Sequence, residues 1–346
     1  MVGFAGNEPI RLRVERVQNG NWDYFIEKVI DDRSPEQGFA NLWHRDGTGK
    51  YKSFSSEING GSKLAISNFL MYGLPRNPEA RPMQIRILDC KIRENNEIKH
   101  VSGQVSLKVQ FEMEKDWGTQ VLTSYAMKLN YTRSINNLES IEPHLRKVLA
   151  NSLKYIHQWV KKESATNILL AKGLQLSFKN YEEEDTDTIY YHKDRALSFD
   201  DFRAKPPRNN KFQAAIFPSF GYDLHRELKE GFIHIHVILK VYMIRSASWA
   251  SALIKSNYSL NHEQRHFDLV KLVSERFKSK LISEKLNLDN YEGIINVEYL
   301  EFYREMNRLQ DKYDQETNHG MNKPKQDDWN RWIDAELNML QTTPNK

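Results

Sequence analysis

The pentapeptide from His262 to His266 has the residue types and the spacing of a metal-dependent hydrolase site. It reads His-Glu-Gln-Arg-His, so two imidazoles stand four residues apart and a glutamate follows the first. On a helix such histidines share one face, about 5–6 Å apart between Cβ atoms, and can bind one zinc ion. The glutamate can act as general base toward a water molecule whose pKa zinc lowers to about 7. We therefore predict a Zn²⁺ site with His262 and His266 as ligands and Glu263 as the catalytic residue.

A helix around this motif is indicated by the residues that follow it. The apolar positions that continue the stripe of the two histidines are Val270, Val273, Phe277 and Leu281. Both histidines are therefore expected on the buried side of the helix, and Asn261 is placed to cap its start. The spacing also leaves a second interpretation open, in which His262 and His266 are partly exposed helix residues that bind no metal.

A catalytic zinc ion needs a third protein ligand and an open fourth position. The downstream candidates are Asp268, Asp314, Glu316 and His319. Asp268 lies two residues past His266 and points elsewhere on the helix. His319 precedes a glycine in a predicted loop between two later helices, and that loop can bring it against the first helix. The other interpretation of His319 is an ordinary loop histidine.

A second histidine pair, His234 and His236, lies on one face of a predicted strand. This His-x-His spacing can bind metal. No third ligand or base stands out nearby. We therefore interpret the pair as the solvent-facing side of a half-buried strand.

Length and composition limit the class of protein. The 346 residues predict about two domains at ~150 residues each. The net charge of +4 comes from 50 basic and 46 acidic residues that are scattered, so we expect no nucleic-acid partner. No apolar run approaches the roughly 18–20 residues of a membrane span. The single cysteine, Cys90, excludes an intrachain disulfide, and the chain contains no P-loop, dinucleotide fingerprint or Gly-x-Ser-x-Gly elbow.

The alternation of apolar residues predicts an α+β chain. Residues 1–162 form one predicted unit, with a strand at 11–17, a hairpin at 104–113 and 121–131, and a helix at 141–160. We interpret this unit as an accessory or partner-binding domain.

Residues 163–346 form the second predicted unit. A hairpin at 213–245 precedes three helices, the first around His262 and the others at 295–313 and 325–340. The sequence leaves the oligomeric state open.

Several further motifs occur in a fixed order around the histidine pair. The segments are 197–202 (Leu-Ser-Phe-Asp-Asp-Phe), Ser248-Trp249, 261–268 (Asn-His-Glu-Gln-Arg-His-Phe-Asp), 313–320 (Tyr-Asp-Gln-Glu-Thr-Asn-His-Gly), Gln326 and Trp329. In this order they resemble a bacterial family of unknown function that is described as predicted secreted zinc-dependent proteases. The resemblance covers about residues 165–340.

The resemblance implies a zincin-like metalloprotease domain with His262, His266 and His319 as metal ligands and Glu263 as base. It also implies an exported protein. Arg265 departs from the pattern, where a smaller or apolar residue is expected. As a middle position it need not touch zinc, but it can alter the mouth of the site.

The first six residues lack the basic and apolar regions of a signal peptide. The chain is therefore either cytoplasmic or a mature form from which such a peptide has been removed. Because the resemblance implies export, we expect a periplasmic or secreted protein in its mature form, and leave a cytoplasmic location open.

The predicted activity is zinc-dependent hydrolysis of a peptide bond, with a peptide or protein as substrate. Two alternatives stay open. The first is a non-catalytic module of the bacterial envelope with a structural zinc or none, in which Asp314 or Glu316 closes the metal site. The second is a zinc amidase that acts on cell-wall peptides, because the same chemistry cleaves any amide.

Overall fold

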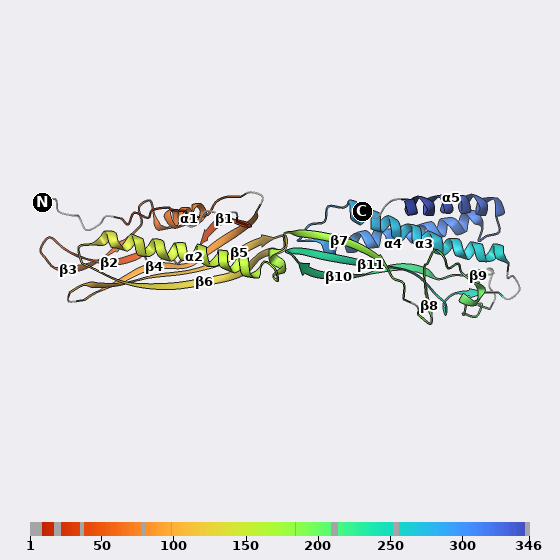
Figure 1. Ribbon diagram of the computed structural model, residues 1–346, viewed down its shortest axis with the longest axis horizontal. Coiled ribbons are helices and arrows are strands. Elements are labelled where there is room, and N and C mark those ends of the chain that lie inside the picture. The colour runs from red at the N-terminus through yellow and green to blue at the C-terminus, as the bar shows by residue number, and fades with distance from the viewer. Residues whose placement is uncertain are drawn as a thin grey trace. The chain divides into compact units, whose positions relative to one another are not determined.

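The computed structural model of the chain divides into two compact units, Met1–Ser164 and Ala165–Lys346 (Figure 1). The structure describes residues 9–16, 22–34, 38–77, 80–97, 99–183, 185–208, 214–251 and 256–342. The first six residues, on which the signal-peptide prediction depends, lie outside these ranges. The predicted α+β class is confirmed, with mixed sheets and a C-terminal group of helices.

One six-stranded mixed sheet forms the first unit. Its strands are β1 (Tyr24–Asp31), β2 (Ala40–Arg45), β3 (Tyr51–Ser56), β4 (Arg81–Asn96), β5 (Val101–Lys115) and β6 (Gly118–Arg133). The order is β3-β2-β4-β5-β6, and β1 also pairs with β4. The predicted hairpin is confirmed as the antiparallel pair of β5 and β6. The alternating apolar residues of β5 are buried, which explains why the pattern was informative.

Two helices lie on one face of this sheet, α1 (Ser62–Tyr72) and α2 (Ile141–Glu163) (Figure 1). The predicted helix is confirmed by α2, which buries Leu145, Leu149 and Leu153. The strand expected at 11–17 is wrong over its described residues 11–16, which form no strand. Its apolar alternation is not buried against a sheet, since Val14 is half exposed.

A four-stranded sheet forms the base of the second unit. Its strands are β7 (Gly173–Asn180), β8 (Thr188–Tyr190), β10 (Pro218–Lys229) and β11 (Phe232–Ile244). β11 is central, antiparallel to β10 and β8 and parallel to β7. The predicted hairpin is confirmed, and its two-residue turn Glu230-Gly231 has positive φ at both positions, as tight hairpins require. A separate short ladder joins β9 (Ala214–Ala215) to β12 (Trp249–Ala250).

The three predicted helices are present as α3 (Asn257–Ser283), α4 (Tyr291–Thr317) and α5 (Lys323–Thr342) (Figure 1). α3 and α4 pack on one face of the sheet, and α5 packs on α3 and α4. Val270, Val273 and Phe277 of α3 pack into the core that α3 shares with the sheet. The predicted cap at Asn261 is wrong, because α3 begins earlier and Ser256 caps it by accepting the Ser259 amide. Within the described part of the chain, no helix is long and apolar enough to cross a bilayer.

Candidate metal centre

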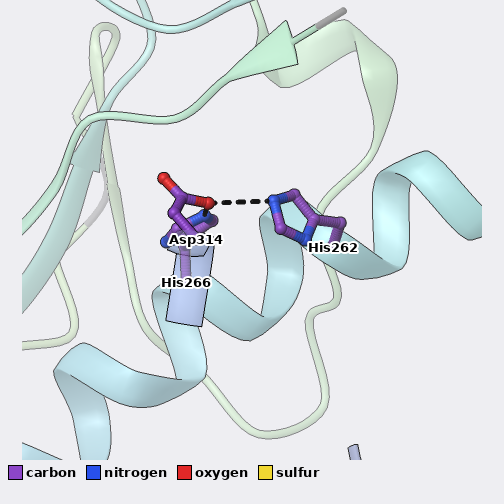
Figure 2. A group of neighbouring side chains, drawn as sticks. All are labelled: His262, His266 and Asp314. Atoms are coloured by element: carbon purple, nitrogen blue, oxygen red, sulfur yellow. Dashed lines mark hydrogen bonds and ion pairs between the residues drawn. The ribbon is translucent and has the colours of Figure 1, made fainter. Parts of the chain in front are cut away.

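Three side chains from two helices converge on one point (Figure 2). His262 and His266 lie one turn apart on α3, with ring centroids 4.9 Å apart. Asp314 reaches them from α4, and its Oδ1 lies 3.2 Å from His262 Nε2 and 2.9 Å from His266 Nε2. The candidate donor atoms of the three residues all lie within 4.8 Å of one another. Both histidines are buried and Asp314 is half-buried.

These residues fit a divalent transition metal. Two ligands at about 2.0–2.1 Å from a tetrahedral zinc are about 3.3–3.4 Å apart, close to the separations of Asp314 Oδ1 from the two imidazole nitrogens. Two imidazoles and one carboxylate are a donor set that such metals accept. The group therefore has the chemistry and the spacing for one ion.

Gln310 of α4 contacts Nδ1 of His266, the ring nitrogen that faces away from Asp314. Gln310 donates its Nε2 to the His266 carbonyl oxygen at 2.9 Å, which fixes the orientation of the amide because a carbonyl only accepts. Its Oε1 then faces His266 Nδ1 and accepts from it. His266 therefore carries a proton on Nδ1 and points Nε2 at Asp314. Nε2 donates to the carboxylate while it is protonated, and it is the nitrogen that can bind a metal ion once that proton has left.

Gln326 of α5 orients the imidazole of His262 in the same way. Gln326 Oε1 lies 2.9 Å from His262 Nδ1. Its Nε2 donates to Asn330 Oδ1 at 3.0 Å, so the amide oxygen is the atom left for the imidazole. The ring of Tyr313 stacks on that of His262, at 4.8 Å between centroids. Each metal-facing imidazole thus has a neutral amide partner.

The electrostatics of the site favour a cation. Burial alone would raise the pKa of Asp314, but hydrogen bonds from His262 and His266 hold it well below its usual range. Burial alone would lower the pKa of His266, but its contact with Asp314 and the nearby charge of Glu263 raise it. The two carboxylates therefore stabilise positive charge at His266, where a bound metal ion would also place it.

Glu263 is buried beside the histidines. Its Oε2 accepts a hydrogen bond from the Ile216 amide at 3.0 Å. Burial raises its pKa, and the two histidines partly oppose this effect. A carboxylate with a raised pKa takes up a proton more readily near neutral pH, which suits a general base.

The Ser248-Trp249 pair supports the segment that holds Glu263. Ser248 Oγ accepts from the Phe217 amide at 2.9 Å and donates to the Ile244 carbonyl at 2.7 Å. Ser248 thereby ties the end of β11 to the residue that follows Ile216. Ser248 therefore helps to fix the segment whose Ile216 amide binds Glu263 of the histidine motif.

The loop after α4 brings His319 to the site, as predicted. Asn318, His319 and Gly320 all have positive φ, of 50°, 50° and 78°. Positive φ is uncommon for residues other than glycine, although asparagine and histidine adopt it more often than most. His319 Nδ1 lies 3.4 Å from Asp314 Oδ2, and the side chain is 41% exposed. The structure places His319 beside Asp314 but outside the three-donor group, so its role as a ligand stays a prediction.

A cavity of about 250 Å³ opens onto these residues. Its walls are residues 214–216, Tyr258 and Ser259 of α3, the loop from His319 to Met321, and the metal-site residues themselves. Gly320 is needed here, because a Cβ at this position would lie 3.2 Å from Cγ of His262. The site thus combines buried donors with an open space.

The other candidate residues are engaged elsewhere. Asp268 bonds Tyr191, Gln264 and Arg265, away from the three-donor group, as its position on the helix predicted. Glu316 accepts from the indole of Trp329. Arg265 pairs with Asp268 and does not line the cavity.

Known proteins add little to this description. The chain matches no family model and no curated protein. A crystal structure of a Xanthomonas campestris protein of the DUF330 family is similar at 9% identity, covering 46% of this chain and all of that one, with a TM-score of 0.32. An uncharacterized protein is similar at 6% identity, covering 44% of this chain and 99% of its own length, with a TM-score of 0.27. Neither supports the protease family that the motifs resemble.

Proposed function

We propose that the chain is a zinc-dependent peptidase whose active site is the cavity beside α3 and α4. One observation carries the proposal. His262 Nε2, His266 Nε2 and Asp314 Oδ1 meet next to the buried carboxylate of Glu263, at the wall of an open cavity. Metal-ligating atoms alone would indicate a site that stores a metal ion or stabilises the fold. Metal-ligating atoms with an adjacent base and a cavity for a substrate indicate hydrolysis.

The residues have separate tasks in this proposal. His262, His266 and Asp314 would hold the ion, which when bound polarises a carbonyl and lowers the pKa of water to about 7. Glu263 takes the proton from the attacking water and delivers it to the leaving amine. Because the Ile216 amide engages Oε2 of Glu263, we assign the proton transfer to Oε1. The walls of the cavity hold the peptide or protein substrate.

A direct test is the cleavage of a peptide library by the full chain, with products identified by mass spectrometry. We expect cleavage that a chelator abolishes and Zn²⁺ restores. Cell-wall peptides belong in the same panel, because cleavage confined to them would identify a zinc amidase. Absence of cleavage across the panel by a zinc-loaded, folded chain would contradict the proposal.

A structural zinc is the second candidate, and the position of His319 favours it. With His319 Nδ1 3.4 Å from Asp314 Oδ2, four protein ligands can close the site and leave no position for water. Asp314→Ala and His319→Ala separate the two cases. Loss of zinc binding in only one variant identifies the third ligand of an open site. Loss in both, with a large fall in melting temperature on chelation, indicates a structural ion.

The location of the protein is part of the proposal. The resemblance to a secreted family supports a periplasmic or secreted peptidase, and the first unit would then bind a partner or substrate there. Fractionation of cells that express the natural gene tests this directly. Recovery of the chain only in the cytoplasm would contradict it.

A further inference from the structure

The β10–β11 hairpin carries four potential metal ligands in a two-by-two block. His225 and Glu227 belong to β10, and His234 and His236 belong to β11. In the strand register His225 stands opposite His236, and Glu227 stands opposite His234. Opposed residues have Cβ atoms about 4.5–5.5 Å apart. Three imidazoles and a carboxylate therefore occupy neighbouring positions on one face.

This face points away from the helices. The alternate residues of β11, such as Ile233 and Ile235, are buried in the core shared with α3. His234 and His236 project to the opposite side. The side chains of His236 and Glu227 are 46% and 59% exposed, so an ion in solution can reach them.

A third strand orients one of these imidazoles. Ser177 of β7 lies beside His236 in the register, and its Oγ is 2.7 Å from His236 Nδ1. That contact leaves Nε2 of His236 facing the block, 3.7 Å from Glu227 Oε1. Metal-binding histidines commonly donate their second ring N–H to an oxygen acceptor, and Ser177 Oγ is placed to be that acceptor for Nδ1 of His236.

We propose that His225, Glu227 and His236, with His234 beside them, form a second site for a divalent transition metal such as Zn²⁺ or Cu²⁺. Imidazole donors suit these ions, whereas Ca²⁺ and Mg²⁺ prefer all-oxygen sites. The distance from His236 Nε2 to Glu227 Oε1 is already near the ligand separation of about 3.3–3.4 Å around a tetrahedral ion. His225 is exposed, so rotation of its side chain completes the set. The site shares no residue with the centre on α3.

Zn²⁺ titration of the full chain by calorimetry tests this proposal. The wild type should bind two ions per chain. His225→Ala/His236→Ala and His262→Ala/His266→Ala should each bind one, and the combined variant none. His100→Ala, an exposed histidine of the first unit, is the matched control and should bind two. Circular dichroism and melting curves establish that each variant is folded.

Ser177→Ala gives an independent readout. It removes no ligand, and it should weaken the hairpin site by about 10-fold and leave the other site unchanged. The proposal is overturned if His225→Ala/His236→Ala binds as many ions as the wild type with unchanged affinities. If the wild type binds a single ion and only His225→Ala/His236→Ala loses it, the hairpin site is supported and the proposed function at His262 and His266 fails.

Discussion

Asp314 Oδ1 lies 2.9 Å from His266 Nε2, although 48 residues separate them in the chain. The contact exists because α3 and α4 pack side by side, with Leu269 and Leu272 of α3 against Tyr313, the neighbour of Asp314. Gln310 on the same face of α4 holds the other side of the His266 ring. α4 thus supplies both Asp314, a candidate metal ligand, and Gln310, which orients the imidazole of His266.

Replacement of Asp314 should therefore remove most of the affinity for zinc. Loss of an outer-shell partner already costs about 10–100-fold, and Asp314→Ala should cost at least as much. Asp311→Ala, which removes an exposed carboxylate from the same helix, is the control and should bind zinc as the wild type does. Competition with a fluorescent zinc indicator measures both. Equal affinities in the two variants would show that Asp314 is not a ligand.

Gln310→Ala tests the orientation of His266. The variant keeps every donor but loses the amide that fixes the Nε2-facing tautomer. We expect zinc to bind about 10–100-fold more weakly. Gln315→Ala, an exposed glutamine of α4, serves as the control. If Gln310→Ala binds zinc normally, the amide does not position the ring.

Gly320→Ala should damage both stability and the site. The residue has φ of 78°, and an added Cβ would lie 3.2 Å from Cγ of His262. The backbone conformation alone costs an L residue about 1–2 kcal/mol, and the contact displaces the imidazole. Urea unfolding and zinc affinity measure the two effects.

Gly293→Ala provides the comparison for this change. It lies in the first turn of α4, and a Cβ there meets no atom within 4 Å. It should leave the stability unchanged or raise it by up to about 1 kcal/mol. Equal stability of the two variants would refute the close approach of Gly320 to His262.

Asp201 should make part of the stability depend on pH. Burial would raise its pKa, but hydrogen bonds from Arg195 and Ser198 lower it. A carboxyl whose pKa is lower in the folded chain than its unfolded value of about 3.9 stabilises the fold above that pH. This contribution is lost as the pH falls through the folded pKa.

Asp201→Asn should therefore cost about 2 kcal/mol at pH 7, a typical value for a hydrogen bond to a charged group. The difference from the wild type should shrink as the pH falls below about 4. Asp200→Asn, an exposed neighbour, should show no such difference. Urea titrations from pH 3 to pH 7 measure it, and a constant difference would contradict the assignment.

Local patterns in the sequence predicted both hairpins and the four longest helices. The histidine motif, the hairpins and the helices are encoded by residues that are close in the chain, so their periodicity shows directly. The start of α3 was missed because Asn261 and Ser256 are both good caps, and only the fold shows that Ser256 accepts the Ser259 amide.

Residues that act across elements were harder to predict. Asp314 was one of several candidates, and only the packing of α4 on α3 distinguishes it. Gln310 resembles a surface residue of an amphipathic helix, and nothing in the sequence links it to His266. The relation of His225 and Glu227 to His236 is equally absent from the sequence pattern, because it depends on the hairpin register.

Glu263→Gln tests whether Glu263 acts as a base beside a bound metal ion. The substitution keeps the size of the side chain and leaves the three donors in place. Zinc-loaded Glu263→Gln should retain wild-type metal content and fold, and should cleave the best library peptide about 10²–10⁴-fold more slowly. Cleavage at the wild-type rate, with the ion bound, would show that Glu263 is not the base.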